Sequence, residues 1–184
     1  MDLYLIRHPA AAVESEVCYG ASDLPLAGPL ASTLRHLRAL LPKDAAIYSS
    51  PLQRALLLAN RLGAATVEPR LREIDFGAWE LKRFEEIGVD ALDRWAADPL
   101  GHRPPGGESA LEMAARVLGF LHELREDPPQ GPVVIVAHGG PLRAIVGHLL
   151  GLPQDRWLAL EFECAKLTHL VIADYGVSLR LFNR

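Results

Sequence analysis

The stretch VVIVAHGGPLRAIVGHLL, residues 133–150, joins an apolar run, a turn of small residues and an amphipathic segment. Val133 to Ala137 is apolar throughout, which is typical of a central parallel strand covered on both faces. Two glycines and a proline then turn the chain, and the large apolar residues that follow recur at helical spacing. The stretch therefore predicts a buried strand that ends at His138 and leads directly into a helix.

Strand and helix patterns alternate on both sides of this unit. Leu3 to Ile6 predicts the first strand, and the leucines from Leu30 to Leu41 predict the first helix. Further strands are expected at residues 45–48, 66–68, 158–162, 167–172 and 177–182, with helices after Ser49–Ser50–Pro51, where the serines are candidate caps, and after the capping-box pair Ser109 and Glu112. This alternation indicates an α/β fold, a three-layer α/β/α arrangement around a mostly parallel sheet.

The chain contains no internal repeat, low-complexity tract or linker that would divide it, so we expect residues 1–184 to form one domain. Residues 71–107 interrupt the alternation with short helical patches and several prolines and glycines. We expect this excursion to lie above the sheet and to cap the active site.

Composition excludes several classes of protein. Hydrophobic residues make up 49% of the chain and charged residues 23%, which excludes wholesale disorder. The net charge of −4 argues against a nucleic-acid partner. No apolar run approaches the roughly 20 residues that span a bilayer, and Arg7 and His8 interrupt the N-terminal run, so neither a membrane segment nor a signal peptide is expected. Two cysteines, Cys18 and Cys164, make no disulfide framework, which favours a cytoplasmic protein.

Reactive side chains follow three of the predicted strands. Arg7 and His8 end the first strand, Arg54 lies in the first turn after the second, and His138 ends the central strand beside a glycine-rich helix start. Open α/β sheets bind ligands at the carboxyl ends of their strands. Guanidinium groups and a helix N-terminus both favour an anion, and phosphate matches the fork of an arginine. Each histidine alone is more simply a structural group, but together these residues predict a phosphate site.

Five motifs occur in a family-specific order. LIRHP (5–9), SSPLQRA (49–55), LREIDFGAWE (71–80), PGGES (105–109) and VAHGGPLR (136–143) resemble the histidine phosphatase superfamily, the phosphoglycerate mutase-like group. The segment CYGASDLPL (18–26) resembles its α-ribazole phosphatase branch. The resemblance implies a phosphoglycerate mutase-like fold and a metal-independent phosphomonoesterase that needs no cofactor and acts through a phosphohistidine.

The same resemblance implies roles for individual residues. His8 would be the nucleophile and Glu73 the proton donor. The phosphate would be held by Arg7, Arg54, His138 and the Gly139 N–H, and Tyr19 and Gly20 fall where substrate contacts lie. Because imidazole titrates near pH 6.5, we expect a bell-shaped pH profile that falls on the acid side as His8 protonates and on the alkaline side as Glu73 ionises.

Two positions leave questions open within this assignment. Pro9 stands where the family commonly has glycine, and proline lacks the backbone N–H that could serve as a donor there. Asp75 is the rival proton donor, because strand-like alternation puts it on the same face as Glu73.

Several functions remain open at this point. The expected substrate is a small phosphate ester, with α-ribazole 5′-phosphate from cobamide nucleotide-loop assembly as the leading one. Sugar phosphates, phosphohistidine proteins, a mutase reaction and an inactive phosphate-binding module are the alternatives. A homodimer also remains open.

Overall fold

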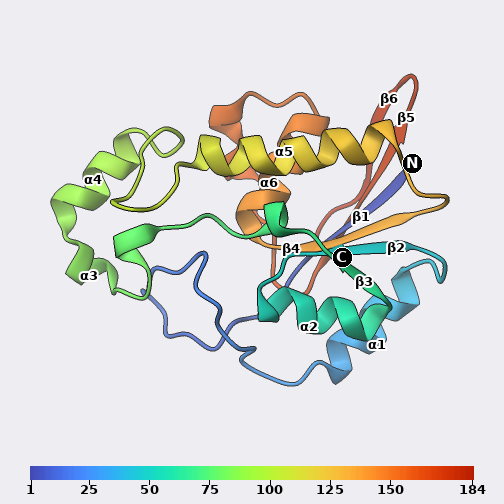
Figure 1. The fold of residues 1–184 in the computed structure, drawn as a ribbon, viewed down its shortest axis with the longest axis horizontal. Coiled ribbons are helices and arrows are strands. Elements are labelled where there is room, and N and C mark those ends of the chain that lie inside the picture. The colour runs from blue at the N-terminus through green and yellow to red at the C-terminus, as the bar shows by residue number, and fades with distance from the viewer.

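The computed structural model describes all 184 residues and contains one six-stranded sheet (Figure 1). Its strand order is β3-β2-β4-β1-β5-β6. The strands are β1 (Asp2–Arg7), β2 (Ala46–Ser49), β3 (Ala65–Val67), β4 (Val133–Ala137), β5 (Leu167–Ala173) and β6 (Gly176–Leu181). β1 to β4 pair in parallel, whereas β5 and β6 add antiparallel at one edge. The predicted α/β fold with a mostly parallel sheet is confirmed.

Helices cover both faces of the sheet, as the three-layer prediction requires (Figure 1). α1 (Ala31–Leu40) and α2 (Gln53–Leu62) cover one face, and α5 (Ala110–Glu126) and α6 (Gly139–Leu149) cover the other. The capping box predicted at the start of α5 is present: Ser109 Oγ accepts from the Glu112 amide, and the Glu112 carboxylate accepts from the Ser109 amide.

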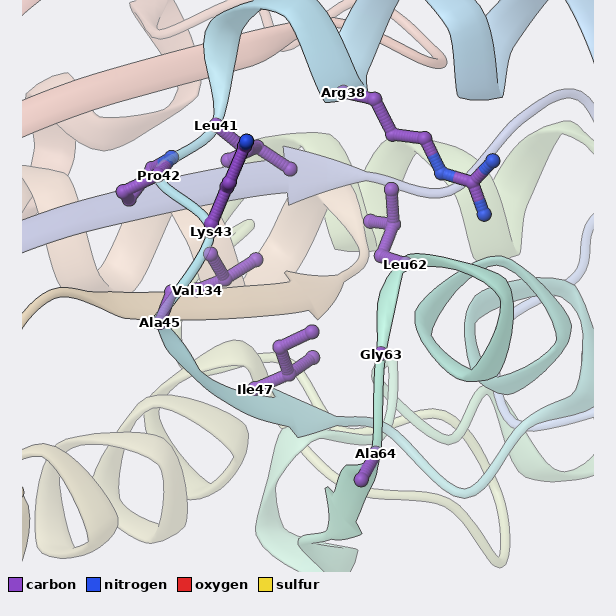
Figure 2. Close-up of a pocket in the computed structure, with 10 residues that line it drawn as sticks. All are labelled: Arg38, Leu41, Pro42, Lys43, Ala45, Ile47, Leu62, Gly63, Ala64 and Val134. Carbon is purple, nitrogen blue, oxygen red and sulfur yellow. The ribbon is translucent and has the colours of Figure 1, made fainter.

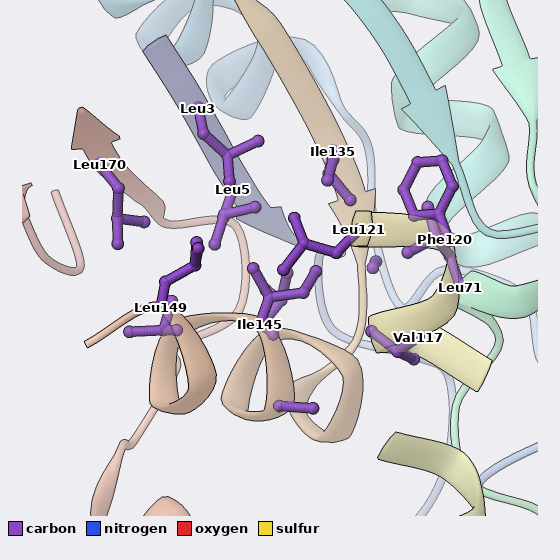
Figure 3. Packing of buried hydrophobic residues seen from close by; sticks show 14 of the residues in the cluster. Leu3, Leu5, Leu71, Val117, Phe120, Leu121, Ile135, Ile145, Leu149 and Leu170 are labelled. Carbon is purple, nitrogen blue, oxygen red and sulfur yellow. The ribbon is translucent and has the colours of Figure 1, made fainter. Parts of the chain in front are cut away.

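β4 supplies both halves of the core because all five of its residues are buried. Val133, Ile135 and Ala137 pack in the larger cluster beneath α5 and α6, whereas Val134 and Val136 pack on the other face against α1 and α2. Figure 3 shows strand side chains of the larger cluster pointing toward helix side chains such as Leu121 and Ile145. A strand that is apolar on both faces can occupy only such a central place.

The chain between β3 and α5 leaves the sheet, which is where the excursion was expected. It consists of the 3₁₀ turns η1 (Pro69–Leu71) and η2 (Gly77–Trp79) and the short helices α3 (Phe84–Ile87) and α4 (Val89–Ala97). In Figure 1 α3 and α4 extend well beyond the edge of the sheet.

Two local predictions were wrong. Residues 158–162 form no strand; the 3₁₀ helix η3 (Gln154–Ala159) runs into this segment instead. Trp157, just before this run, anchors the segment on α6, because it is buried so closely against Gly147 that a Cβ there would lie 2.3 Å from the indole ring. The Trp157 indole N–H donates to the Leu152 carbonyl at 3.0 Å.

The second error concerns the start of α2. The helix begins at Gln53 rather than Pro51, and neither Ser49 nor Ser50 caps it, since its N-cap is Leu52 without a side-chain bond. Both serines are fully buried, and the Ser50 hydroxyl points to the site described next.

Candidate active site

The parallel pairing of β1 with β4 brings two histidines together. Arg7 is in register with Ala137, so His8 and His138, each the first residue after its strand, lie side by side. Their ring centroids are 4.9 Å apart, and the side chains are 2% and 0% exposed. The two histidines that the sequence singled out therefore meet at the carboxyl end of the sheet.

Hydrogen bonds fix the tautomer of His8. Its Nδ1 lies 2.5 Å from the Pro9 carbonyl oxygen, which can only accept, so Nδ1 carries the proton. The Nε of Arg54, which can only donate, lies 3.3 Å from Nε2 of the same ring. Nε2 therefore keeps its lone pair. Burial, followed by the charges of Arg54 and Arg7, lowers the pKa of His8 to about 3 although the Pro9 bond opposes it, so the ring is neutral at pH 7.

Ser50 performs a similar function for His138. The Ser50 Oγ accepts from the Leu52 amide at 3.3 Å and lies 2.7 Å from Nε2 of His138. A hydroxyl that accepts from Leu52 can still give its own proton to Nε2, and in that arrangement the His138 proton lies on Nδ1. Burial, aided by the charges of Arg54 and Arg7, holds the pKa of His138 well below its usual value.

Arg54 is fully buried in the first turn of α2, where a loop of the chain grips it. Its Nη2 donates to the Gly20 carbonyl at 2.6 Å and its Nη1 to the Ser22 carbonyl at 2.7 Å. The Glu80 carboxylate in turn accepts from three successive amides of this loop, Gly20 through Ser22, at 2.9–3.1 Å. Gly20 therefore links the two residues: its amide donates to Glu80 and its carbonyl accepts from Arg54.

Two buried polar atoms at this site have no partner in the protein. They are Nε of Arg7 and Nδ1 of His138. Buried polar groups are nearly always hydrogen-bonded, so two orphans in one place indicate a polar ligand. The Gly139 N–H lies beside them at the first position of α6, where a helix leaves its amides unpaired. Because the two unpaired side-chain groups and this amide can all donate, they suit an anion.

The structure separates the two rival carboxylates. Glu73 accepts from the Gly140 amide at 3.2 Å, so its carboxylate lies against the same helix start as His138. Asp75 instead accepts from the Gly77 amide at 2.8 Å, within its own turn. Arg116 fixes the Glu73 backbone by donating to its carbonyl at 3.0 Å.

A cavity of about 270 Å³ adjoins Glu73 and Gly140. The predicted residue Tyr19 lines it, with its ring centroid 5.5 Å from the Arg54 guanidinium carbon. Arg143 lines it as well; Nε of Arg143 donates to the Leu160 carbonyl at 2.9 Å. Its Nη1 lies 3.0 Å from where a Cβ on Gly139 would stand. Ser50, Glu80 and Arg143 were not predicted as site residues, although each lies inside a motif quoted above.

A second hollow, of about 440 Å³, lies at the opposite, amino end of the parallel strands (Figure 2). The ends of α1 and α2 and the start of β2 line it, with Arg38 and Lys43 among the lining side chains. None of the site residues proposed from the sequence reaches it.

No group of three or more His, Cys, Asp and Glu side chains is placed to hold a metal ion. No helix has the length and apolar character needed to cross a membrane.

Known proteins are similar to this chain in sequence and in fold. A family model, the histidine phosphatase superfamily (branch 1), matches residues 3–184. A relative from Hydrogenobacter thermophilus, provisionally named phosphoserine phosphatase 2, is 34% identical over 99% of this chain and 95% of its own.

Two solved structures share the fold. The α-ribazole phosphatase of Shigella flexneri superposes with a TM-score of 0.90 at 25% identity, covering 100% of this chain and 96% of its own. A mycobacterial glucosyl-3-phosphoglycerate phosphatase, solved with VO3, superposes with a TM-score of 0.85 at 30% identity over 99% of this chain and 98% of its own.

Proposed function

Because the chain belongs to the histidine phosphatase superfamily (branch 1) and is a phosphoric monoester hydrolase, we propose that His8 is the group that takes the phosphoryl group. The Nε2 lone pair attacks phosphorus, the ester P–O bond breaks, and the alcohol leaves. Water then attacks the phosphohistidine, which releases inorganic phosphate and regenerates His8. No electrons are gained or lost in either step.

The observation that carries this proposal is the tautomer of His8. A histidine nucleophile needs an unprotonated nitrogen facing its substrate, and the Pro9 carbonyl supports that form by holding the proton on Nδ1. The lowered pKa of His8 keeps the ring neutral throughout the physiological range. Pro9 thus contributes its carbonyl to the nucleophile, although it offers no amide.

We assign the phosphate to Arg7, Arg54, His138 and the Gly139 N–H. The orphan Nε of Arg7 and Nδ1 of His138 support this assignment, since both are buried and unpaired beside His8. Phosphoryl transfer redistributes negative charge over the equatorial oxygens, and fixed donors stabilise that charge without reorganising.

Glu73 is the proton donor in this proposal, because its contact with Gly140 supports a place beside the phosphate site. An alkoxide leaves readily only when protonated, so the Glu73 carboxyl gives its proton to the leaving oxygen. The resulting carboxylate takes a proton from the attacking water in the second step. The bond of Asp75 to the Gly77 amide, in a separate turn, supports Glu73 rather than Asp75 in this role.

The names of the similar proteins suggest three candidate substrates: phosphoserine, glucosyl-3-phosphoglycerate and α-ribazole 5′-phosphate. We favour α-ribazole 5′-phosphate, of cobamide nucleotide-loop assembly, because the segment CYGASDLPL (18–26) resembles that branch. Tyr19 would touch this substrate. Residues 1–184 would act as one domain, in the cytoplasm, with residues 71–107 over the site. No second subunit is needed, since every group named belongs to one chain.

The test is hydrolysis of p-nitrophenyl phosphate in EDTA by the wild type and His8→Ala. We expect turnover by the wild type, none by His8→Ala, and an acid-labile phosphoenzyme only in the wild type. His122→Ala is the matched control, because the His122 side chain is 71% exposed and remote from the site in its bond to Glu126. Vanadate binding without turnover would instead indicate an inactive phosphate-binding module, and transfer to a second alcohol rather than to water would indicate a mutase.

A further inference from the structure

The cavity beside Glu73 has a lining that selects the alcohol part of the substrate. Fourteen residues line it, and ten of them are hydrophobic. The remaining four are Glu73, Pro99, Gly140 and Arg143. A site for a polyol would present many free hydrogen-bonding side chains. In this lining Tyr19, Glu73, Arg143 and the Trp95 indole offer one, since the Trp157 N–H is bonded to Leu152.

The large apolar side chains come from three separate parts of the chain. The excursion contributes Phe76, Trp95 and Leu100, the start of α5 contributes Leu111, and η3 contributes Trp157 and Leu158. Leu111 and Leu158 are 40% and 46% exposed. Large apolar side chains that gather at one exposed mouth mark a binding surface rather than a core.

Continuity with the reacting centre identifies the occupant. The leaving oxygen must lie within hydrogen-bond distance of its proton donor. The alcohol part of the substrate therefore lies on the same side of the phosphate site as Glu73. Glu73 and Gly140 both line the cavity, and the Gly140 amide binds the Glu73 carboxylate. Whatever leaves from His8 past Glu73 therefore enters this apolar space.

Charge separates the remaining options. A free amino-acid alcohol carries an ammonium and a carboxylate, and the only carboxylate in the lining is the proton donor itself. Arg143 is the only cation in the lining, and beyond its bond to Leu160 its Nη groups donate to no protein acceptor. One free guanidinium beside a large apolar wall suits an alcohol with an apolar body and one acceptor near the ester.

We propose that the natural leaving group is an alcohol with a large, mostly apolar body, bound in the cavity between Trp95, Leu111 and Leu158. The proposal rests on the proposed function, since it needs Glu73 as proton donor, and it narrows the substrate class of that site. Esters of amino-acid alcohols and of polyols are poor substrates on this reading.

The test compares esters that differ in the body of the alcohol and not in its leaving ability. Propyl phosphate and 3-phenylpropyl phosphate are both esters of simple primary alcohols, so their ratio of kcat/KM reports binding of the ring. Burial of a side chain of phenyl size predicts at least about a tenfold preference for 3-phenylpropyl phosphate. Phosphoserine and glycerol phosphate should be no better than propyl phosphate.

Surface leucines provide matched variants that leave the fold and the reacting groups intact. Leu158→Ser should lower the ratio of kcat/KM for 3-phenylpropyl phosphate over propyl phosphate about threefold or more, because it removes apolar surface that the phenyl group would contact. Leu57→Ser is its control, because Leu57 is equally exposed, at 46%, and does not line the cavity. The pair Leu111→Ser and Leu179→Ser, at 40% and 41% exposure, repeats the comparison.

The outcomes are distinct. If p-nitrophenyl phosphate is hydrolysed but the phenylpropyl and propyl esters are used equally, or if phosphoserine is the best substrate, the apolar leaving-group site is wrong and the proposed function stands. If no ester is hydrolysed, the proposed function fails and this inference fails with it.

Discussion

Glu80 and Arg54 both hydrogen-bond to the backbone of the loop at residues 20–22. The loop gives its amides to Glu80 and its carbonyls to Arg54, so Gly20 is bonded to both. Glu80 also accepts from the Ser22 hydroxyl at 2.6 Å and from the Phe76 amide at 2.9 Å. Burial raises the pKa of this carboxyl, but these bonds outweigh burial and lower it below its usual value. Glu80 is therefore a charged positioning residue, which acts on Arg54 through the loop and not by a direct hydrogen bond.

Replacing Glu80 should weaken phosphate binding. Glu80→Gln keeps the shape but points an NH2 group at amide donors, and loss of such buried bonds lowers kcat/KM roughly 10- to 100-fold. Vanadate inhibition should weaken in parallel, which a purely structural role would not produce at temperatures far below unfolding. Glu85→Gln is the control, because that side chain is 78% exposed. Unchanged vanadate affinity in Glu80→Gln would show that the Glu80 carboxylate is not needed to position Arg54.

Ser50→Ala should change the tautomer of His138. Without the Ser50 hydroxyl, Nε2 of His138 loses its hydrogen-bond donor. The ring proton is then no longer kept on Nδ1, where it would donate to the phosphate. We expect about a tenfold loss in kcat/KM, the value of one lost hydrogen bond to a charged ligand. Nitrogen NMR of labelled histidine reads the tautomer directly. Ser49→Ala is the control, since Ser49 is equally buried and its hydroxyl bonds only a backbone carbonyl. An unaltered His138 tautomer in Ser50→Ala would contradict the assignment.

The buried histidines should make the fold sensitive to acid. In the unfolded chain a histidine titrates near 6.5, whereas the folded pKa of His8 is about 3. Between these values the unfolded chain binds a proton that the folded one refuses, so stability falls as the pH drops below 6.5. At pH 5 the loss from His8 is about 2 kcal/mol, and His138 adds to it in the same direction.

Urea unfolding at pH 7 and pH 5 measures this effect. His8→Asn should reduce the difference in the free energy of unfolding between pH 7 and pH 5 by the contribution of His8. The exposed control His122→Asn should leave this difference unchanged. Equal pH dependence in wild type and His8→Asn would refute the neutral buried form. The acid limb of the rate profile should likewise lie well below the pH near 6.5 that an unperturbed imidazole predicts.

Linear motifs predict which residues gather but not which atoms bond. His8 and His138 could be placed together because two apolar runs end at them, and parallel strands end at one edge. Nothing in the spacing of SSPLQRA says that its second serine faces a histidine rather than capping a helix. Nor does the spacing reveal that Glu80 reaches back to Gly20, since that contact joins residues 60 positions apart.

The wrong strand at 158–162 has a similar cause. A short apolar run reads equally well as a buried strand or as anchors packed on a helix. Here Trp157, the residue before the run, packs on α6, because Gly147 has no Cβ and leaves space for the indole ring. That fit depends on two segments meeting in space, which periodicity along one segment does not encode.

Glu73 and Asp75 can be distinguished by the kind of ester that each variant still hydrolyses. An alkoxide needs a proton to leave and nitrophenolate does not, so loss of the acid should harm propyl phosphate far more than p-nitrophenyl phosphate. We expect Glu73→Gln to lower kcat/KM for propyl phosphate roughly 100-fold or more, with a much smaller loss on p-nitrophenyl phosphate. Asp75→Asn is the matched control: it loosens the turn at Gly77 and should lower both rates by the same small factor. A selective loss on propyl phosphate in Asp75→Asn, with none in Glu73→Gln, would transfer the proton donor to Asp75, and the apolar cavity would then no longer adjoin the leaving oxygen.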